Sequence, residues 1–140
     1  MSLELIVYIL TGLAAVVIVL TRLRLRGDGG AERVHVGHGL LNLHTVAGVV
    51  ALALWVAFLL SDEETVMGGE VVGIVALAFW WITVVAGLLI LVRWLPSHGK
   101  HASSGTQDTW SEGPGLSVLA HVGMLVGVSV FTFAYLTAAV

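Results

Sequence analysis

Four long apolar blocks, at roughly residues 3–21, 37–60, 70–92 and 115–140, constrain the fold of this chain more than any other feature. Each block is near or above the ~20 residues that an α-helix needs to cross about 30 Å of hydrocarbon. Of the 140 residues, 58% are hydrophobic and only 11% are charged, which is too little charge to cover a soluble domain of this size. The sequence therefore predicts an all-α integral membrane protein: a single four-helix up-and-down bundle over residues 1–140, with helices at about 3–25, 37–60, 70–94 and 115–138.

The first block is expected to be a retained helix rather than a signal peptide. Its start carries Glu4 and no basic residue, whereas a signal peptide begins with positive charge. Its apolar run is also longer than a secretory core region, and no small-residue cleavage site follows it.

The charged residues predict an orientation. The connection between the second and third blocks has no basic residue and holds three acidic ones, Asp62, Glu63 and Glu64. Basic residues favour the cytoplasmic side, so we expect a multi-pass protein of the cell (inner) membrane with both termini outside and the histidine-rich loops in the cytoplasm. All six basic residues lie in or beside the other two connections: Arg22, Arg24, Arg26, Arg33, Arg93 and Lys100.

Net charge and cysteine content narrow the partners and cofactors. The net charge of −3 gives no reason to expect nucleic acid, and the predicted partner is the lipid bilayer. The chain has no cysteine, which excludes disulfides, iron–sulfur clusters and covalent haem attachment through a Cys-x-x-Cys-His motif.

Two histidines, His44 and His121, each lie about two turns inside the start of an apolar block, the second and the fourth. Alternate helices of an up-and-down bundle enter from the same face, so these two imidazoles should lie at the same depth and face each other. A matched pair of imidazoles on facing helices is what axial ligation of a haem iron requires. The spacing predicts one haem b near the cytoplasmic face, with His44 and His121 as its iron ligands.

Three neighbouring residues extend this candidate site. Gly48 lies one turn deeper than His44, where a missing side chain would leave room for a flat macrocycle. Arg22 and Arg93, at the cytoplasmic helix ends, are placed to neutralise haem propionates, and snorkelling to the interface is the alternative for both.

Two further patterns allow additional sites or contacts. The pairs His35–His38 and His98–His101 share a His-x-x-His spacing and could form a second site for Zn²⁺ or Cu²⁺, although solvated loop histidines would look the same. The Gly-x-x-x-Gly pairs at 69/73 and 123/127 favour close helix packing within one bundle, with a homodimer seam as the alternative. Trp80 falls in mid-helix, where contact with the core or with lipid is expected.

Two short segments of the second block resemble known haem-bearing helices. The run from His38 to Asn42 resembles the His-Gly-x-x-Asn start of such a helix in the ascorbate-reducible transmembrane b-type cytochromes, and the run from His44 to Gly48 resembles their His-x-x-x-Gly pattern. Ligation from alternate helices is also similar to that in the four-helix halves of haem A synthases. The resemblance implies a b-type cytochrome with His44 and His121 as ligands. Those families often carry a second histidine pair near the opposite face, and this chain has none there.

These features favour a small cytochrome that exchanges electrons with a quinone or with a partner oxidoreductase. One alternative is a membrane protein that handles copper or zinc through its histidines. Another is a non-catalytic accessory subunit of a larger membrane complex, in which the histidines are structural. No hydrolytic constellation is apparent, because the apolar blocks contain no acid–base pair.

Overall fold

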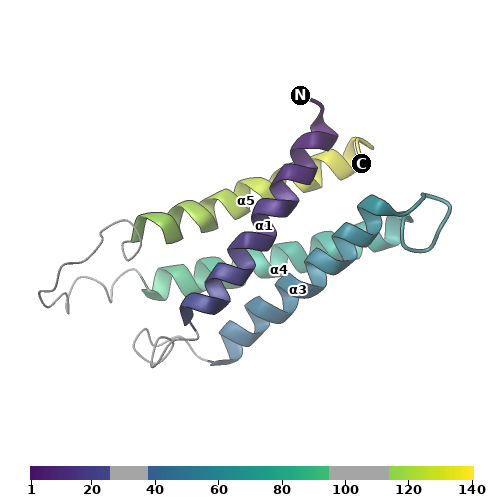
Figure 1. The fold of residues 1–140 in the computed structure, drawn as a ribbon. Coiled ribbons are helices and arrows are strands. Elements are labelled where there is room, and N and C mark those ends of the chain that lie inside the picture. The colour runs from purple at the N-terminus through teal and green to yellow at the C-terminus, as the bar shows by residue number, and fades with distance from the viewer. Residues whose placement is uncertain (26–37, 95–113) are drawn as a thin grey trace, which may run out of the picture.

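Four α-helices make up most of the described part of the chain. The computed structural model describes residues 1–25, 38–94 and 114–140, and these residues contain no β-strand. The helices are α1 (Leu3–Leu25), α3 (His38–Leu60), α4 (Glu70–Trp94) and α5 (Pro114–Leu136) (Figure 1). The all-α prediction is confirmed, and the largest boundary error is at the end of α5, predicted at 138 and observed at Leu136.

Local chemistry explains where the helices begin and end. The Ser2 hydroxyl oxygen accepts a hydrogen bond from the Leu5 amide at 3.2 Å, which caps α1. Pro114 is the first residue of α5, a position where its missing N–H and fixed φ are tolerated. Between α3 and α4, a Cβ on Gly68 would collide with the carbonyl oxygen of Asp62, so this turn requires glycine.

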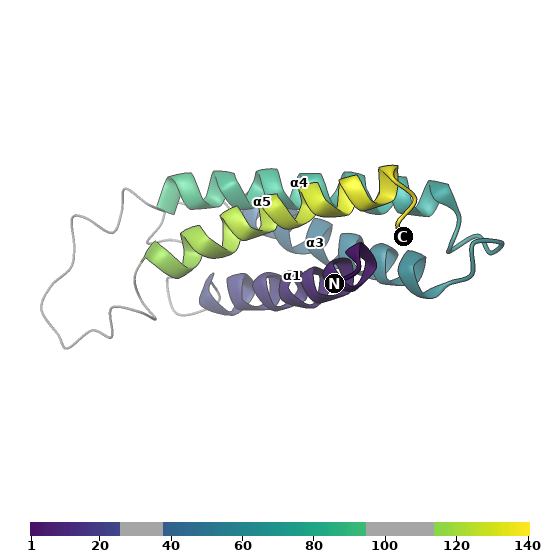
Figure 2. The same cartoon turned by 90° about the horizontal axis from the view of Figure 1, so that it is seen from above.

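Consecutive helices run in opposite directions, so both termini and the α3–α4 turn lie at the same end of the bundle (Figures 1 and 2). Helix α3 packs against α4 and α1, and α5 packs against the same two helices. Helices α3 and α5 therefore lie on a diagonal across the interior. The α3–α4 interface is the most extensive of the four.

The outer surface of the bundle is apolar. All four helices are long and apolar enough to cross a membrane, by length and composition. Large apolar side chains remain exposed on every helix, for example Leu13, Val46, Ile74 and Val126, each more than half exposed. Helices that are apolar all round normally lie in a large core or in a bilayer.

One half of the interior, which we call the aromatic half, is filled by five aromatic side chains. Their rings follow one another at centroid separations of 5.7, 5.1, 5.5 and 5.8 Å, in the order Trp80, Phe131, Trp55, Phe58 and Tyr135. This half lies toward the end that holds both termini. Of the two contacts expected for Trp80, with the core or with lipid, the structure has the core contact, since its side chain is fully enclosed.

Hydrogen bonds between side chains and neighbouring helices reinforce the aromatic half. Helices α1 and α3 are joined by the bonds Tyr8 Oη–H to the Leu59 carbonyl (3.1 Å) and Trp55 Nε1–H to Thr11 Oγ1 (3.2 Å). Helices α4 and α5 are joined by Trp81 Nε1–H to Thr132 Oγ1 (3.2 Å) and by Tyr135 Oη–H to the Glu70 carbonyl (2.9 Å). The α1–α3 pair and the α4–α5 pair thus have two cross-links each.

The glycine pairs behave differently from each other. A Cβ on Gly73 would lie only 2.6 Å from Tyr135 Cε2 and 3.1 Å from Phe58 Cε2, so the predicted packing inside the bundle is confirmed at this residue. A Cβ on Gly123 or Gly127 would meet no atom within 4 Å among the described residues. The second pair is therefore not used for close packing within this part of the chain, and the homodimer seam stays a prediction.

Candidate functional site

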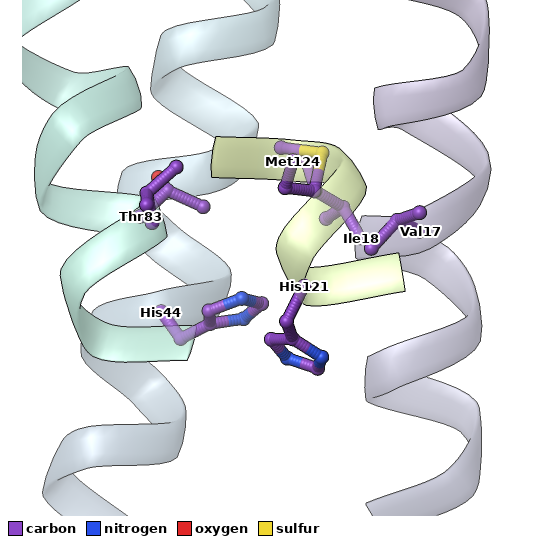
Figure 3. Close-up of a pocket in the computed structure, with 7 residues that line it drawn as sticks. Val17, Ile18, His44, Thr83, His121 and Met124 are labelled. Carbon is purple, nitrogen blue, oxygen red and sulfur yellow. The ribbon is translucent and has the colours of Figure 1, made fainter. Parts of the chain in front are cut away.

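The two predicted histidines meet in the other half of the interior. His44 projects from α3 and His121 from α5, across the diagonal of the bundle (Figure 3). Both side chains are buried, with 4% and 9% of their surfaces exposed. Their ring centroids are 6.4 Å apart and their planes are inclined by 40°. Helices that share no extensive interface thus bring these two side chains together.

The separation of the rings suits a shared metal ion. A metal lies about 2.0–2.1 Å from a coordinating imidazole nitrogen, and that nitrogen lies roughly 1.1 Å from the ring centre, so two imidazoles on opposite sides of one metal have centres roughly 6.3 Å apart. The observed 6.4 Å agrees with this value. Aromatic rings in direct contact have centroids about 4.5–7 Å apart, so the same separation and the 40° tilt also fit a direct contact between the two rings.

A third helix forms the wall beside the pair. A Cβ on Gly87 of α4 would lie 2.9 Å from His121 Cδ2, 3.2 Å from His44 Nε2 and 3.3 Å from His44 Cδ2. Both imidazoles therefore pack against the bare backbone of α4 at one residue. We call the region around His44, Gly87 and His121 the histidine half of the interior.

Gly48 faces two side chains that also line the cavity beside the histidines. A Cβ on Gly48 would approach Ile18 Cδ1 at 3.1 Å, Ile18 Cγ1 at 3.2 Å and Thr83 Cγ2 at 3.3 Å. The sequence predicted room for a macrocycle beside this glycine. In the structure, the side chains of Ile18 and Thr83 lie there. The glycine that borders the imidazoles is Gly87 of α4.

The cavity beside the histidines is small and mainly apolar. Its volume is about 10 Å³, enough for about one water molecule. Apart from the two histidines, it is lined by Val17, Ile18, Thr83, Val84 and Met124 (Figure 3). The donor pair and its spacing fit an iron ion, whereas a macrocycle requires these lining side chains to move aside. Met124 is suited to such repacking because its thioether chain is unbranched and flexible.

The remaining candidate residues lie away from the pair or outside the described residues. Arg93, in the last turn of α4, and His38, the first residue of α3, are both exposed. Arg22 belongs to the last turns of α1, and its side chain is outside the described set. The other three histidines of the predicted second metal site also lie outside it: His35, His98 and His101. Within residues 1–25, 38–94 and 114–140, no group of three or more His, Cys, Asp or Glu side chains could hold a metal ion.

No protein-family model, curated protein or solved structure matches this chain. The candidate site therefore rests on its own geometry.

Sequence reasoning missed two contributors to the site, Gly87 and Ile18. Glycine is unfavourable inside a helix by roughly 1 kcal/mol relative to alanine, so a glycine deep in an apolar helix is a signal of close packing. That signal was available for Gly87, but the residue it approaches depends on how α4 is rotated about its axis. Ile18 carried no signal at all, because it is one apolar residue among many on α1.

Proposed function

We propose that this chain is a membrane-embedded b-type cytochrome that binds one haem b through His44 and His121 and exchanges electrons with a quinone or a partner oxidoreductase. The observation that carries the proposal is the buried pairing of two imidazoles from diagonal helices at 6.4 Å, the separation expected for two ligands of one metal.

The number of protein ligands favours haem over a bare ion. A porphyrin provides four in-plane nitrogens, so two axial histidines complete the coordination of its iron. A structural zinc site takes four protein ligands, and Cu²⁺ prefers a square-planar or tetragonal set of nitrogen and oxygen ligands. No third histidine or carboxylate joins the pair among the described residues. A copper or zinc ion at this pair would lack the remaining ligands that it prefers among the described residues.

The bound haem iron would supply one-electron oxidation and reduction. The residues of the chain would hold the metal from two sides, keep water away and fix the ligand orientation. His44 and His121 are carried by rigid helices, and Val84 and Met124 give the surroundings a low polarity. Burial and the hydrogen bonds around the ligands are the features through which a protein sets the potential of such a centre.

The membrane location is part of the proposal. Its support is the apolar outer surface of the bundle and the length of the four helices. The six basic residues, which lie in or beside the first and third connections of the sequence, favour both termini outside the cell (inner) membrane and the histidine pair near the cytoplasmic face. One centre near one face cannot carry electrons across the whole bilayer, so electrons would enter and leave on the same side or through a mobile quinone.

An absorbance spectrum of the detergent-purified protein, oxidised and then reduced with dithionite, tests the proposal. The expected result is the Soret and α bands of six-coordinate low-spin haem, lost in His44→Ala and in His121→Ala. His38→Ala is the matched control, because it removes an exposed histidine from α3, the helix that carries His44, and should leave the spectrum unchanged. A colourless protein from cells that supply haem would overturn the proposal, and so would full haem content in either buried-histidine variant. Stoichiometric copper or zinc in the colourless protein would establish the metal-handling alternative.

A further inference from the structure

Helix α4 contributes no ligand to the proposed centre, yet its backbone touches both rings. At Gly87 an added Cβ would lie 2.9 Å from His121 Cδ2, closer than real Cβ atoms approach their neighbours. The same Cβ would be 3.2 Å from His44 Nε2, so one added methyl group would press on both imidazoles at once.

Retreat of α4 from this contact would give up its close packing against neighbouring helices. One turn before Gly87, the methyl group of Thr83 lies against Gly48 of α3. A Cβ added to Gly48 would be only 3.3 Å from this methyl group. Thr83 is buried, and so are Ala86, Ile90 and Leu91 around it on α4. Close-packed interiors transmit such strain rather than absorb it. A side chain at residue 87 would therefore displace the rings.

We propose that Gly87 is a positioning residue that sets the separation and mutual tilt of His44 and His121 for metal ligation. This inference rests on the proposed haem-binding function and adds a third helix to the site. The absence of a side chain at residue 87 lets both imidazoles lie against the α4 backbone at the separation that a shared metal would need.

The test compares Gly87→Ala with Gly123→Ala in the full-length, detergent-purified protein. Both substitutions bring the same gain in helix propensity. Gly123 lies two residues from His121 but is exposed, and its added Cβ would meet nothing within 4 Å in the described part of the chain. Gly87→Ala should lower the haem content per protein at least tenfold or, where haem is retained, shift the g-values of the low-spin ferric electron paramagnetic resonance signal, because these depend on the relative orientation of the two imidazole planes. Gly123→Ala should match the wild type in both measurements.

Three results distinguish the possible failures. A red wild type together with a Gly87→Ala protein of unchanged haem content and unchanged g-values overturns the role of Gly87 and leaves the cytochrome proposal standing. A wild type without haem overturns the cytochrome proposal and, with it, this inference. Haem content reduced equally in Gly123→Ala also overturns the role of Gly87, because the effect would then not depend on the contact.

If Gly87→Ala folds too poorly for its haem content to be measured, a double-mutant comparison tests the same contact. In the His121→Ala background the closest ring is gone, so adding Gly87→Ala should lower the melting temperature of the haem-free protein much less than it does in the wild-type background. Equal losses in the two backgrounds would overturn the proposed contact.

Discussion

The aromatic half and the histidine half of the interior are built from opposite kinds of side chain. In the aromatic half, large rings such as Trp55 and Phe131 fill the space between helices, and four side-chain hydrogen bonds join neighbouring helices. In the histidine half, glycines at 48 and 87 bring backbones close to their neighbours, and the small cavity lies beside the imidazoles.

The difference suggests a division of labour between stability and ligand binding. A bundle whose helices are fixed at one end by interlocking rings can hold two facing side chains at the other end in defined positions. Variants in the two halves should therefore have different effects: on the free energy of unfolding in the aromatic half, and on ligand content in the histidine half.

The largest expected effect is in the aromatic half. Phe131→Ala should lower the free energy of unfolding in detergent by about 3 kcal/mol, the low end for a buried phenylalanine, because lipid or detergent solvates the ring and mainly packing is lost. Phe131 is 1% exposed and contacts both Trp55 and Trp80. Phe133→Ala is the matched control, since Phe133 lies two residues away and is 60% exposed. Equal losses in the two variants would contradict the importance of the aromatic half.

In the histidine half, the expected stability effect comes from the ligand. A ligand present at 100 times its Kd and bound only by the folded state stabilises that state by about 2.7 kcal/mol. Haem at this excess should therefore raise the melting temperature of the wild type and of His38→Ala, but not that of His121→Ala. A similar haem-induced shift in His121→Ala would place the binding site elsewhere on the chain.

Comparing substitutions at two buried tryptophans distinguishes the contribution of a hydrogen bond to stability from that of packing. Trp55→Phe removes the Nε1–H bond to Thr11 and should cost about 1 kcal/mol more than Trp80→Phe. Trp80 is equally buried, but its Nε1 has no hydrogen-bond partner among the described residues, so phenylalanine removes an unsatisfied donor there. The measurement is the free energy of unfolding of both variants in the same detergent. A greater loss in Trp80→Phe would contradict the assigned bond.

The smallest effect is expected at the edge of the aromatic half. Tyr135→Phe removes only the hydroxyl that donates to the Glu70 carbonyl, and inter-helix hydrogen bonds of this kind are worth about 0.6 kcal/mol. The ring itself, which packs on Phe58, is retained. The melting temperature should fall slightly, and the haem content, measured by absorbance, should not change. A loss exceeding that of Trp55→Phe would mean that the α4–α5 cross-link matters more than the one between α1 and α3.

Much of the fold could be predicted because it depends on local properties. The apolar blocks set the number of helices, and the start predicted for the fourth helix, residue 115, is one residue from the observed start of α5 at Pro114. The equal depth of His44 and His121 follows from counting turns along two helices that start at the same end. The sequence could not show which Gly-x-x-x-Gly pair packs against another helix, because this depends on what lies opposite each glycine. In the described residues Gly73 faces rings of other helices, whereas Gly123 and Gly127 face no atom within 4 Å.

The sequence by itself determined four helices, their direction and the level at which the two histidines lie. Only the tertiary structure decided that Gly87, rather than Gly48, borders the imidazoles, and that Ile18 and Thr83 cover Gly48. The physical reason is that these helices are apolar on every side, so hydrophobic periodicity does not reveal which face turns inward. Rotation of each helix about its axis is set instead by the fit of individual side chains, a glycine against a ring or a methyl group against a glycine, and that fit exists only once the helices are packed together.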